Sequence, residues 1–267
     1  MLEIILSLNP IIQAGLATLF TWSITAIGAS LVYFFKKVNK NIMDGMLGFA
    51  GGVMIAASFF SLIAPAISMA ENLNMIPWLV VFLGFFSGGI LLYIGDKIYD
   101  LYEKKHKKGK KNLGFKRCVM LVSSITLHNI PEGMAVGVAF GSVIYGLDGA
   151  TLMAAWTLAL GIGLQNFPEG TAVSMPLRRE GMSRNKAFFL GQLSGIVEPI
   201  AGIIGAILVM KMQSLLPFLL AFAAGAMIYV VVEELIPESQ TNQKKDLMAL
   251  FTLIGFSLMM ILDIALG

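Results

Sequence analysis

The chain has 267 residues, of which 57% are hydrophobic and 13% are charged, with a net charge of +3 and a mean hydropathy of +0.81. Soluble globular chains carry about 25% charged residues, and a water-soluble fold of this size cannot hide so much apolar surface. The composition therefore excludes an ordinary soluble enzyme and predicts a protein embedded in the lipid bilayer. The single cysteine, Cys118, excludes an intramolecular disulfide and a zinc-ribbon cluster.

Eight stretches are long and apolar enough to cross a membrane, because a spanning helix needs roughly 20 mostly apolar residues. The predicted spans are, in chain order, 11–35, 46–70, 76–96, 118–144, 149–177, 187–210, 215–237 and 247–266. Little chain remains between them, so we predict an all-α membrane protein in which residues 1–267 form one polytopic transmembrane domain. The first ten residues hold no Lys or Arg, so we expect the first span to be retained and not cleaved as a signal peptide.

The basic residues predict how the spans are oriented. With the N-terminus outside, every Lys and Arg except Lys211 falls in the predicted cytoplasmic loops 36–45, 97–117, 178–186 and 238–246. The positive-inside rule therefore places both termini on the extracytoplasmic side of the cell (inner) membrane. The Lys-rich run 104–111, within the basic loop 97–117, is interpreted as a solvated segment that fixes orientation, so no nucleic-acid partner is expected.

The fourth and fifth spans each contain one copy of an internal repeat, x-N-x-P-E-G-x-A-V. The first copy begins at His128 with the sequence HNIPEG, and the second begins at Gln165 with QNFPEG. Residues four apart share a helix face, so His128 points the same way as Glu132, and Gln165 the same way as Glu169. Consecutive spans are antiparallel, so the repeat predicts two similar half-sites that face each other near the middle of the membrane.

The other polar residues of the two motifs also suit a metal ion. The asparagines, Asn129 and Asn166, are offset by about 100° from the residues before them and can serve a second, adjacent ion. A proline three residues into each motif removes a backbone donor, which leaves a carbonyl free to line a watered cavity.

Acidic residues inside the spans lack basic partners. Glu132 and Glu169 are joined by Glu198, beside a proline in the sixth span, and by Glu233 and Glu234 before a proline in the seventh. A carboxylate in hydrocarbon is costly, so an intramembrane acid is by default a functional residue. A divalent cation would neutralise several at once, and by the predicted topology Glu233 and Glu234 suit a cytoplasmic exit.

At these residues the chain resembles the ZIP (Zrt/Irt-like) family of metal transporters, and within it the prokaryotic GufA-like branch. HNIPEG, QNFPEG and the Glu-Pro of the sixth span are similar to that family's metal motifs, as are the segment 48–65 and the EELIPES of the seventh span. The resemblance implies eight spans with both termini outside, and an elevator-like motion of a central four-helix transport unit against the remaining spans.

The resemblance also implies a binuclear metal site. One ion would be held by His128, Glu132, Gln165 and Glu169, with Met54 of the second span as a soft ligand. The residues implied for the second ion are Asn129, Glu132, Asn166, Glu169 and Glu198, with Glu132 and Glu169 bridging. Oxygen ligands with one imidazole suit Zn²⁺, Fe²⁺, Mn²⁺ or Cd²⁺ as transported ions, and no resident cofactor is expected.

The function predicted from these residues is zinc-type metal transport toward the cytoplasm, and three questions stay open. A passive divalent-cation channel would use the same ligands. An intramembrane metalloprotease would activate water but normally needs two histidines, and the spans hold only His128. Small residues at four-residue spacing, Gly84–Gly88 and Gly191–Gly195, pack helices within the chain or across a homodimer.

Overall fold

The computed structural model describes residues 8–35, 39–105, 113–147, 149–179 and 181–266, and all regular structure within them is helical. Inside the helices, the side chains at positions 96, 99–100, 102–105, 113–121, 123–124 and 127–128 lie outside the described part. The longer elements are α2 (Pro10–Ala29), α4 (Lys40–Ala57), α5 (Ala64–Asn72), α6 (Pro77–Lys105), α7 (Leu113–Ser142), α8 (Leu152–Arg179), α9 (Arg184–Leu193), α10 (Val197–Lys211), α11 (Leu216–Val230) and α13 (Lys245–Leu266). The short ones are α3 (Leu31–Phe34), α12 (Ile236–Ser239), the 3₁₀ turns η2 (Val143–Tyr145) and η3 (Gln213–Leu215), and the π-helical turns η1 (Ser58–Ile63) and η4 (Val231–Leu235).

Six helical segments among the described residues are long and apolar enough to cross a membrane. They are Pro10–Phe34, Lys40–Asn72, Pro77–Gly95, Arg184–Lys211, Gln213–Ser239 and Lys245–Leu266, and each overlaps one predicted span. The predicted fourth and fifth spans correspond to α7 and α8, which have 30 and 28 residues but are not among the six. In α8, the polar motif residues Gln165, Asn166 and Glu169 lower the apolar character of the helix.

The ends of several helices differ from the prediction. Helix α4 begins at Lys40 and α6 continues to Lys105, so part of each segment predicted as a loop, 36–45 and 97–117, is helical. Lysine is a good helix former, and a charged residue ends the apolar pattern without ending the helix. The predicted boundaries therefore follow the apolar stretch and miss the helical extensions beyond it.

The helices form two groups, and the first contains α2, α7, α8, α9 and α10. The backbone of α7 lies against α10, since a Cβ on Gly137 would stand 2.0 Å from the carbonyl oxygen of Gly202. Helix α8 approaches α2 as closely, where a Cβ on Gly170 would stand 2.1 Å from the carbonyl oxygen of Thr25. These helix pairs can pack this tightly only because glycine has no side chain there.

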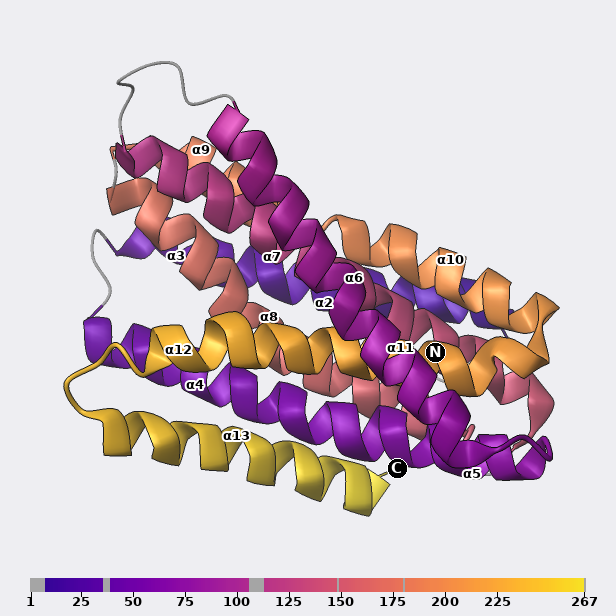
Figure 1. Cartoon of the computed structure of the whole chain (residues 1–267). Helices are drawn as coiled ribbons and strands as arrows, with labels where there is room; N and C mark the ends of the chain where they lie inside the picture. Colours follow the sequence, from indigo (N-terminus) through magenta and orange to yellow (C-terminus); the bar gives the residue numbers. More distant parts are fainter. Residues whose placement is uncertain (1–7, 36–38, 106–112, 148, 180, 267) are drawn as a thin grey trace.

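The second group contains α4, α5, α6, α11, α12 and α13, and Figure 1 shows α13 lying along α4 and α6 crossing α11. A Cβ on Gly52 would stand 2.0 Å from the Thr252 carbonyl oxygen, and one on Gly88 would stand 2.0 Å from that of Phe222. The groups meet where α4 packs against α8 and α11 against α7. The core they share is made of side chains such as Met54, which is fully buried.

The predicted small-residue pairs are used inside the chain. Gly84 and Gly88 of α6 contact the backbone of α11, while Gly191 contacts Ala29 and Ser174, and Gly195 contacts Thr25. A homodimer stays a prediction, and these two pairs already have partners within the chain.

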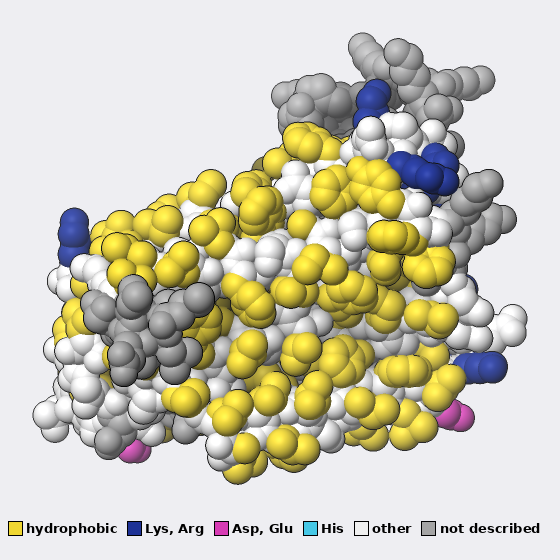
Figure 2. Space-filling view, turned by 180° about the vertical axis from the view of Figure 1, so that it is seen from behind, with side chains coloured by type: hydrophobic (Ala, Val, Ile, Leu, Met, Phe, Trp, Pro, Cys, Tyr) yellow, Lys and Arg dark blue, Asp and Glu magenta, His cyan; other side chains and the backbone are white. Residues whose placement is uncertain are grey.

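The surface separates apolar and basic side chains. Figure 2 shows hydrophobic side chains over a broad face, with most of the visible Lys and Arg at one end. At this end the Tyr33 hydroxyl bonds Asn185 at 3.1 Å, and Lys40 Nζ bonds the Thr241 hydroxyl at 2.9 Å. The start of α4 therefore adjoins the start of α13, so the two helices run in the same direction, and Lys211 ends α10 at the opposite side.

Candidate metal centre

Glu132 of α7 and Gln165 of α8 meet in the interior of the first helix group. Both are fully buried, and Gln165 Nε2 donates a hydrogen bond to Glu132 Oε1 at 2.6 Å. Pro131 and Pro168, each one residue before a motif glutamate, lie inside their helices, where a proline cannot donate to the preceding turn. The structure thus brings the two copies of the repeat together.

The asparagines of the two motifs bind the broken sixth helical segment. Asn129 Nδ2 donates to the Ser194 carbonyl oxygen at 2.9 Å, where the chain passes from α9 to α10. Glu198 lies in the first turn of α10, and Asn166 Nδ2 is 3.0 and 2.9 Å from its two carboxylate oxygens. The hydroxyl of Thr21, from α2, donates to Glu198 as well. Glu198 is fully buried and is held by two neighbouring helices.

Several oxygens of this cluster have no hydrogen-bond partner. Among the described residues, six buried side-chain polar atoms are unpaired, and two of them are the hydroxyls of Ser58 and Thr157. The other four all belong to the repeat, and they are Asn129 Oδ1, Glu132 Oε2, Gln165 Oε1 and Asn166 Oδ1. A buried acceptor without a donor costs about 1–3 kcal/mol, so four on the two copies of one repeat call for an explanation. All four are oxygens that can coordinate a cation.

The electrostatics of the cluster are those of an anion-rich interior. The charges of Glu169 and Glu198 act on Glu132, and the charges of Glu198 and Glu234 act on Glu169. No set of three or more His, Cys, Asp or Glu side chains within the described ranges is arranged to hold a metal ion by itself. Among the described residues, the unpaired oxygens that the centre offers to an ion include the amide oxygens of Asn and Gln.

The glycine that ends the first motif explains how α10 comes so close. A Cβ on Gly133 would stand 2.4 Å from the carbonyl oxygen of Glu198 and 2.6 Å from its Cα. The absence of a side chain at Gly133 lets the start of α10 lie directly on α7, which brings the Glu198 carboxylate within reach of Asn166.

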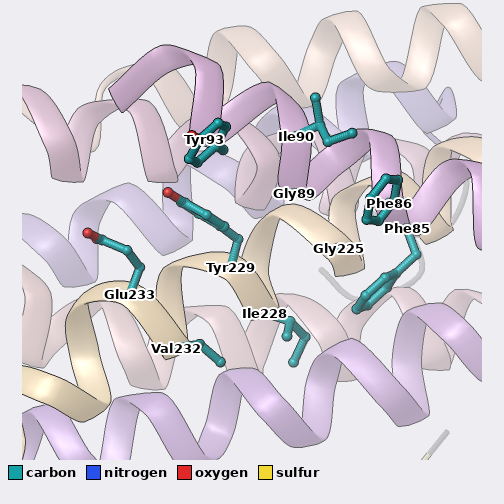
Figure 3. Close-up of a pocket in the computed structure, with 10 residues that line it drawn as sticks. All are labelled: Phe85, Phe86, Gly89, Ile90, Tyr93, Gly225, Ile228, Tyr229, Val232 and Glu233. Atoms are coloured by element: carbon teal, nitrogen blue, oxygen red, sulfur yellow. The ribbon is translucent and has the colours of Figure 1, made fainter. Parts of the chain in front are cut away.

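The remaining predicted residues are placed as follows. His128 lies in α7, but its side chain is outside the described part of the structure. Met54 is buried in α4, the helix that packs against α8. Glu233 and Glu234 lie in the π-helical turn η4, which precedes a proline. Figure 3 shows Glu233 beside Tyr229. Both residues line a groove of about 590 Å³ between α6 and the segment formed by α11 and η4. The charge of Glu234, by contrast, acts on Glu169.

Thr21 is the residue of this centre that sequence reasoning missed. Its helix carries Thr18, Thr21 and Thr25, and all three are buried. Spacings of three and four place these hydroxyls on one helix face, and that polar stripe in an apolar span is the signal that could have found them.

Comparison with known proteins bears directly on this arrangement. The family model described as ZIP zinc transporter matches residues 11–119 and 115–263. The chain belongs to the ZIP family. The family consists of transporters and not enzymes, so the protease alternative falls away, and the chain is a multi-pass membrane protein.

Relatives within the family cover nearly the whole chain. The zinc transporter ZIP11 of Xenopus tropicalis is 40% identical over 97% of this chain and 98% of its own. The zinc transporter GufA of Myxococcus xanthus is 34% identical over 95% of this chain and 99% of its own. The zinc transporter ZIPB of Bordetella bronchiseptica is 35% identical over 91% of this chain and 78% of its own. The resemblance to GufA-like ZIP proteins is thereby confirmed.

Proposed function

We propose that this ZIP protein moves a divalent metal ion, zinc in the first place, across the membrane toward the cytoplasm through the motif centre of α7 and α8. The observation that carries the proposal is the set of four unpaired, buried oxygens on the two motif copies. A cation bound by oxygens of this set would offset the cost of leaving them unpaired and would neutralise nearby carboxylates. The relatives named above are zinc transporters, which supports the same substrate class.

The proposed ligands suit reversible binding of a metal ion. Glu132, Gln165 and Glu169 supply oxygens, and His128, one turn before Glu132, would add an imidazole. Such a mixed set accepts Zn²⁺, Cd²⁺, Fe²⁺ or Mn²⁺, whereas a thiolate cage would retain zinc too strongly for transport. Met54 is the further ligand implied by the resemblance. The implied second ion depends on Glu198.

The proposed topology is eight spans with both termini outside the cytoplasm. Helices α7 and α8 would cross with the six apolar segments, and the neighbouring helices would cover the polar residues that lower their apolar character. The concentration of Lys and Arg at one end of the bundle supports that end as the cytoplasmic one. For a prokaryotic GufA-like chain this membrane would be the cell (inner) membrane.

The proposed mechanism is an elevator-type alternating access. The two motif copies and Glu198 lie within the group of α2, α7, α8, α9 and α10, whose backbones interlock through glycines. The other group interlocks separately, and the two meet mainly through side chains. Sliding of the first group along α4 and α11 would carry the ion from one side to the other while the internal packing of each group is kept.

Residues toward the two ends would guide the ion. Asp263 of α13 accepts a hydrogen bond from Ser61 at 2.6 Å, at the end opposite the basic one, where an acid would attract cations. Glu234, whose charge reaches Glu169, would receive the ion on the cytoplasmic side. A similar exit role for Glu233 stays a prediction, since its side chain lines the groove between α6 and α11.

The test is uptake of radioactive zinc into proteoliposomes that contain the purified protein. Glu132→Gln and Glu169→Gln keep the size of the side chain and remove the charge, so each should reduce uptake to the level of empty vesicles. Glu71→Gln, at an exposed acid in α5, is the matched control and should transport normally. Undiminished uptake by both motif variants would refute the proposal.

The same assay distinguishes a carrier from a passive channel. A carrier that must move for every ion saturates with metal concentration, whereas a pore gives flux that rises linearly. We expect saturation, because Glu132, Gln165 and Glu198 are fully buried, so the protein would have to move to release each ion.

A further inference from the structure

The carboxylate of Glu198 is hydrogen-bonded by neutral groups of its own helix group. Asn166 Nδ2, from α8, lies 3.0 Å from Glu198 Oε1 and 2.9 Å from Oε2, and the Thr21 hydroxyl, from α2, donates to Oε2. Among the described residues, neither oxygen of Glu198 is left unpaired, whereas one oxygen of Glu132 is. Glu198 therefore has hydrogen bonds at both carboxylate oxygens, whereas Glu132 has one at a single oxygen.

The end of the Asn166 side chain that faces Glu198 must be its nitrogen. Three acceptors surround that atom, the two oxygens of Glu198 and the carbonyl oxygen of Thr21 at 3.2 Å. Asparagine nitrogen and oxygen are assigned by their partners, and an oxygen in this position would face three other oxygens. With its nitrogen turned toward Glu198, the Asn166 side chain presents no oxygen there to a cation that would bridge the two residues.

The oxygens that remain available lie elsewhere. The four unpaired acceptors belong to Asn129, Glu132, Gln165 and Asn166, so all are on the two motif copies and none is on α10. Asn129 points its nitrogen at the Ser194 carbonyl, which leaves its oxygen unpaired. The capacity to bind a cation is therefore concentrated between α7 and α8.

We infer that this transporter carries one metal ion at a time, between the two motif copies, and that the Asn166 amide and the Thr21 hydroxyl take the place of a second ion at Glu198. The inference rests on the proposed function and departs from the binuclear site implied by the resemblance. Neutral donors can satisfy a buried carboxylate when both of its oxygens are bonded. Thr21 is then a positioning residue, which acts on the centre through Glu198.

The experiment counts bound ions. Purified protein in lipid nanodiscs is saturated with Zn²⁺, freed of unbound metal by gel filtration, and analysed for zinc per chain. We expect one ion for the wild type. Asn166→Asp would place a second carboxylate beside that of Glu198, so a second ion should bind between them and raise the count to two. Adding Glu198→Gln restores the hydrogen bond with donor and acceptor exchanged, so the double variant should return to one.

Substitutions at Thr21 test the positioning role. Thr21→Val removes the hydroxyl at nearly constant size, leaves one oxygen of Glu198 short of a donor, and should allow a second, weaker ion to bind. Thr21→Ser keeps the hydroxyl and should keep the count at one. A loss of packing alone would not change the stoichiometry and would not be rescued by serine.

The outcomes separate this inference from the proposed function. Two ions bound to the wild type, one of which is lost in Glu198→Gln, would overturn the single-ion inference and leave metal transport standing. A count of one in Asn166→Asp would overturn it as well. Wild-type protein that binds no zinc would overturn the proposed function itself. The wild-type count decides the question even if a variant fails to fold.

Discussion

The two copies of the repeat have nearly the same sequence and different surroundings. In α7, the asparagine Asn129 bonds a backbone carbonyl at the break between α9 and α10, and Gly133 lies against the start of α10. In α8, the asparagine Asn166 bonds the carboxylate of Glu198, and Gly170 lies against α2. The two glycines therefore face different helices, whereas both asparagines bond the α9–α10 segment.

This difference shows that the repeat determines the local features of each motif, whereas the surrounding segments determine the partner of each asparagine. The shared Pro, Glu and Gly give both copies a proline inside a continuous helix, a buried carboxylate and the close approach of another helix. What each asparagine nitrogen bonds depends on the part of the α9–α10 segment that it faces, which is the neutral Ser194 carbonyl for Asn129 and the Glu198 carboxylate for Asn166. The copy in α8 therefore binds the Glu198 carboxylate through its asparagine, and the copy in α7 does not.

The largest expected effect comes from filling the glycine contacts of each copy. Gly133→Ala and Gly170→Ala would put a Cβ at 2.4 and 2.1 Å from backbone oxygens, which requires helices to move apart. Overpacking of this kind costs about 1–3 kcal/mol or more, so we expect the midpoint of thermal unfolding to fall by about 5–10 °C. Transport should be lost in both variants, as measured by zinc uptake and by unfolding in detergent.

A matched control is available on α2. Gly15→Ala would place its Cβ 3.7 Å from the side chain of Ile203, an ordinary contact, and should change neither stability nor uptake. If one motif variant is as stable and active as Gly15→Ala, then that copy does not depend on close helix packing at its glycine.

A smaller effect is expected from Thr21, which touches the α8 half of the centre alone. Thr21→Val leaves Glu198 without one donor in a buried place, and such a loss costs about 1–3 kcal/mol. The unfolding temperature of the metal-free protein should fall by a few degrees, and Thr21→Ser should recover it. Equal stability of the valine and serine variants would mean that the hydroxyl contributes nothing to holding Glu198.

Much of this architecture could be predicted from the chain, and the exceptions share a cause. The apolar stretches predict the helices, and the repeat predicts that Glu132 and Gln165 lie together, because both depend on local spacing and on antiparallel neighbours. The contact of Thr21 with Glu198 joins residues 177 positions apart, and no local pattern indicates it. The break between α9 and α10 has no proline at its centre, and the helical extensions into basic segments lie beyond the apolar signal.

The smallest expected effect lies at the cytoplasmic side of the α8 copy. The charge of Glu234 acts on Glu169, so Glu234→Gln should weaken the attraction that draws an ion from the centre toward the exit. Partly exposed charge pairs contribute a few tenths to about 1 kcal/mol, which corresponds to a fall in uptake rate of about threefold. Glu238→Gln, at an exposed acid in α12, is the control and should change the rate less. The effect should shrink at high salt, because salt screens exposed charges. An equal response of both variants would assign the effect to the net charge of this surface, and the α8 copy would then have no special link to the exit.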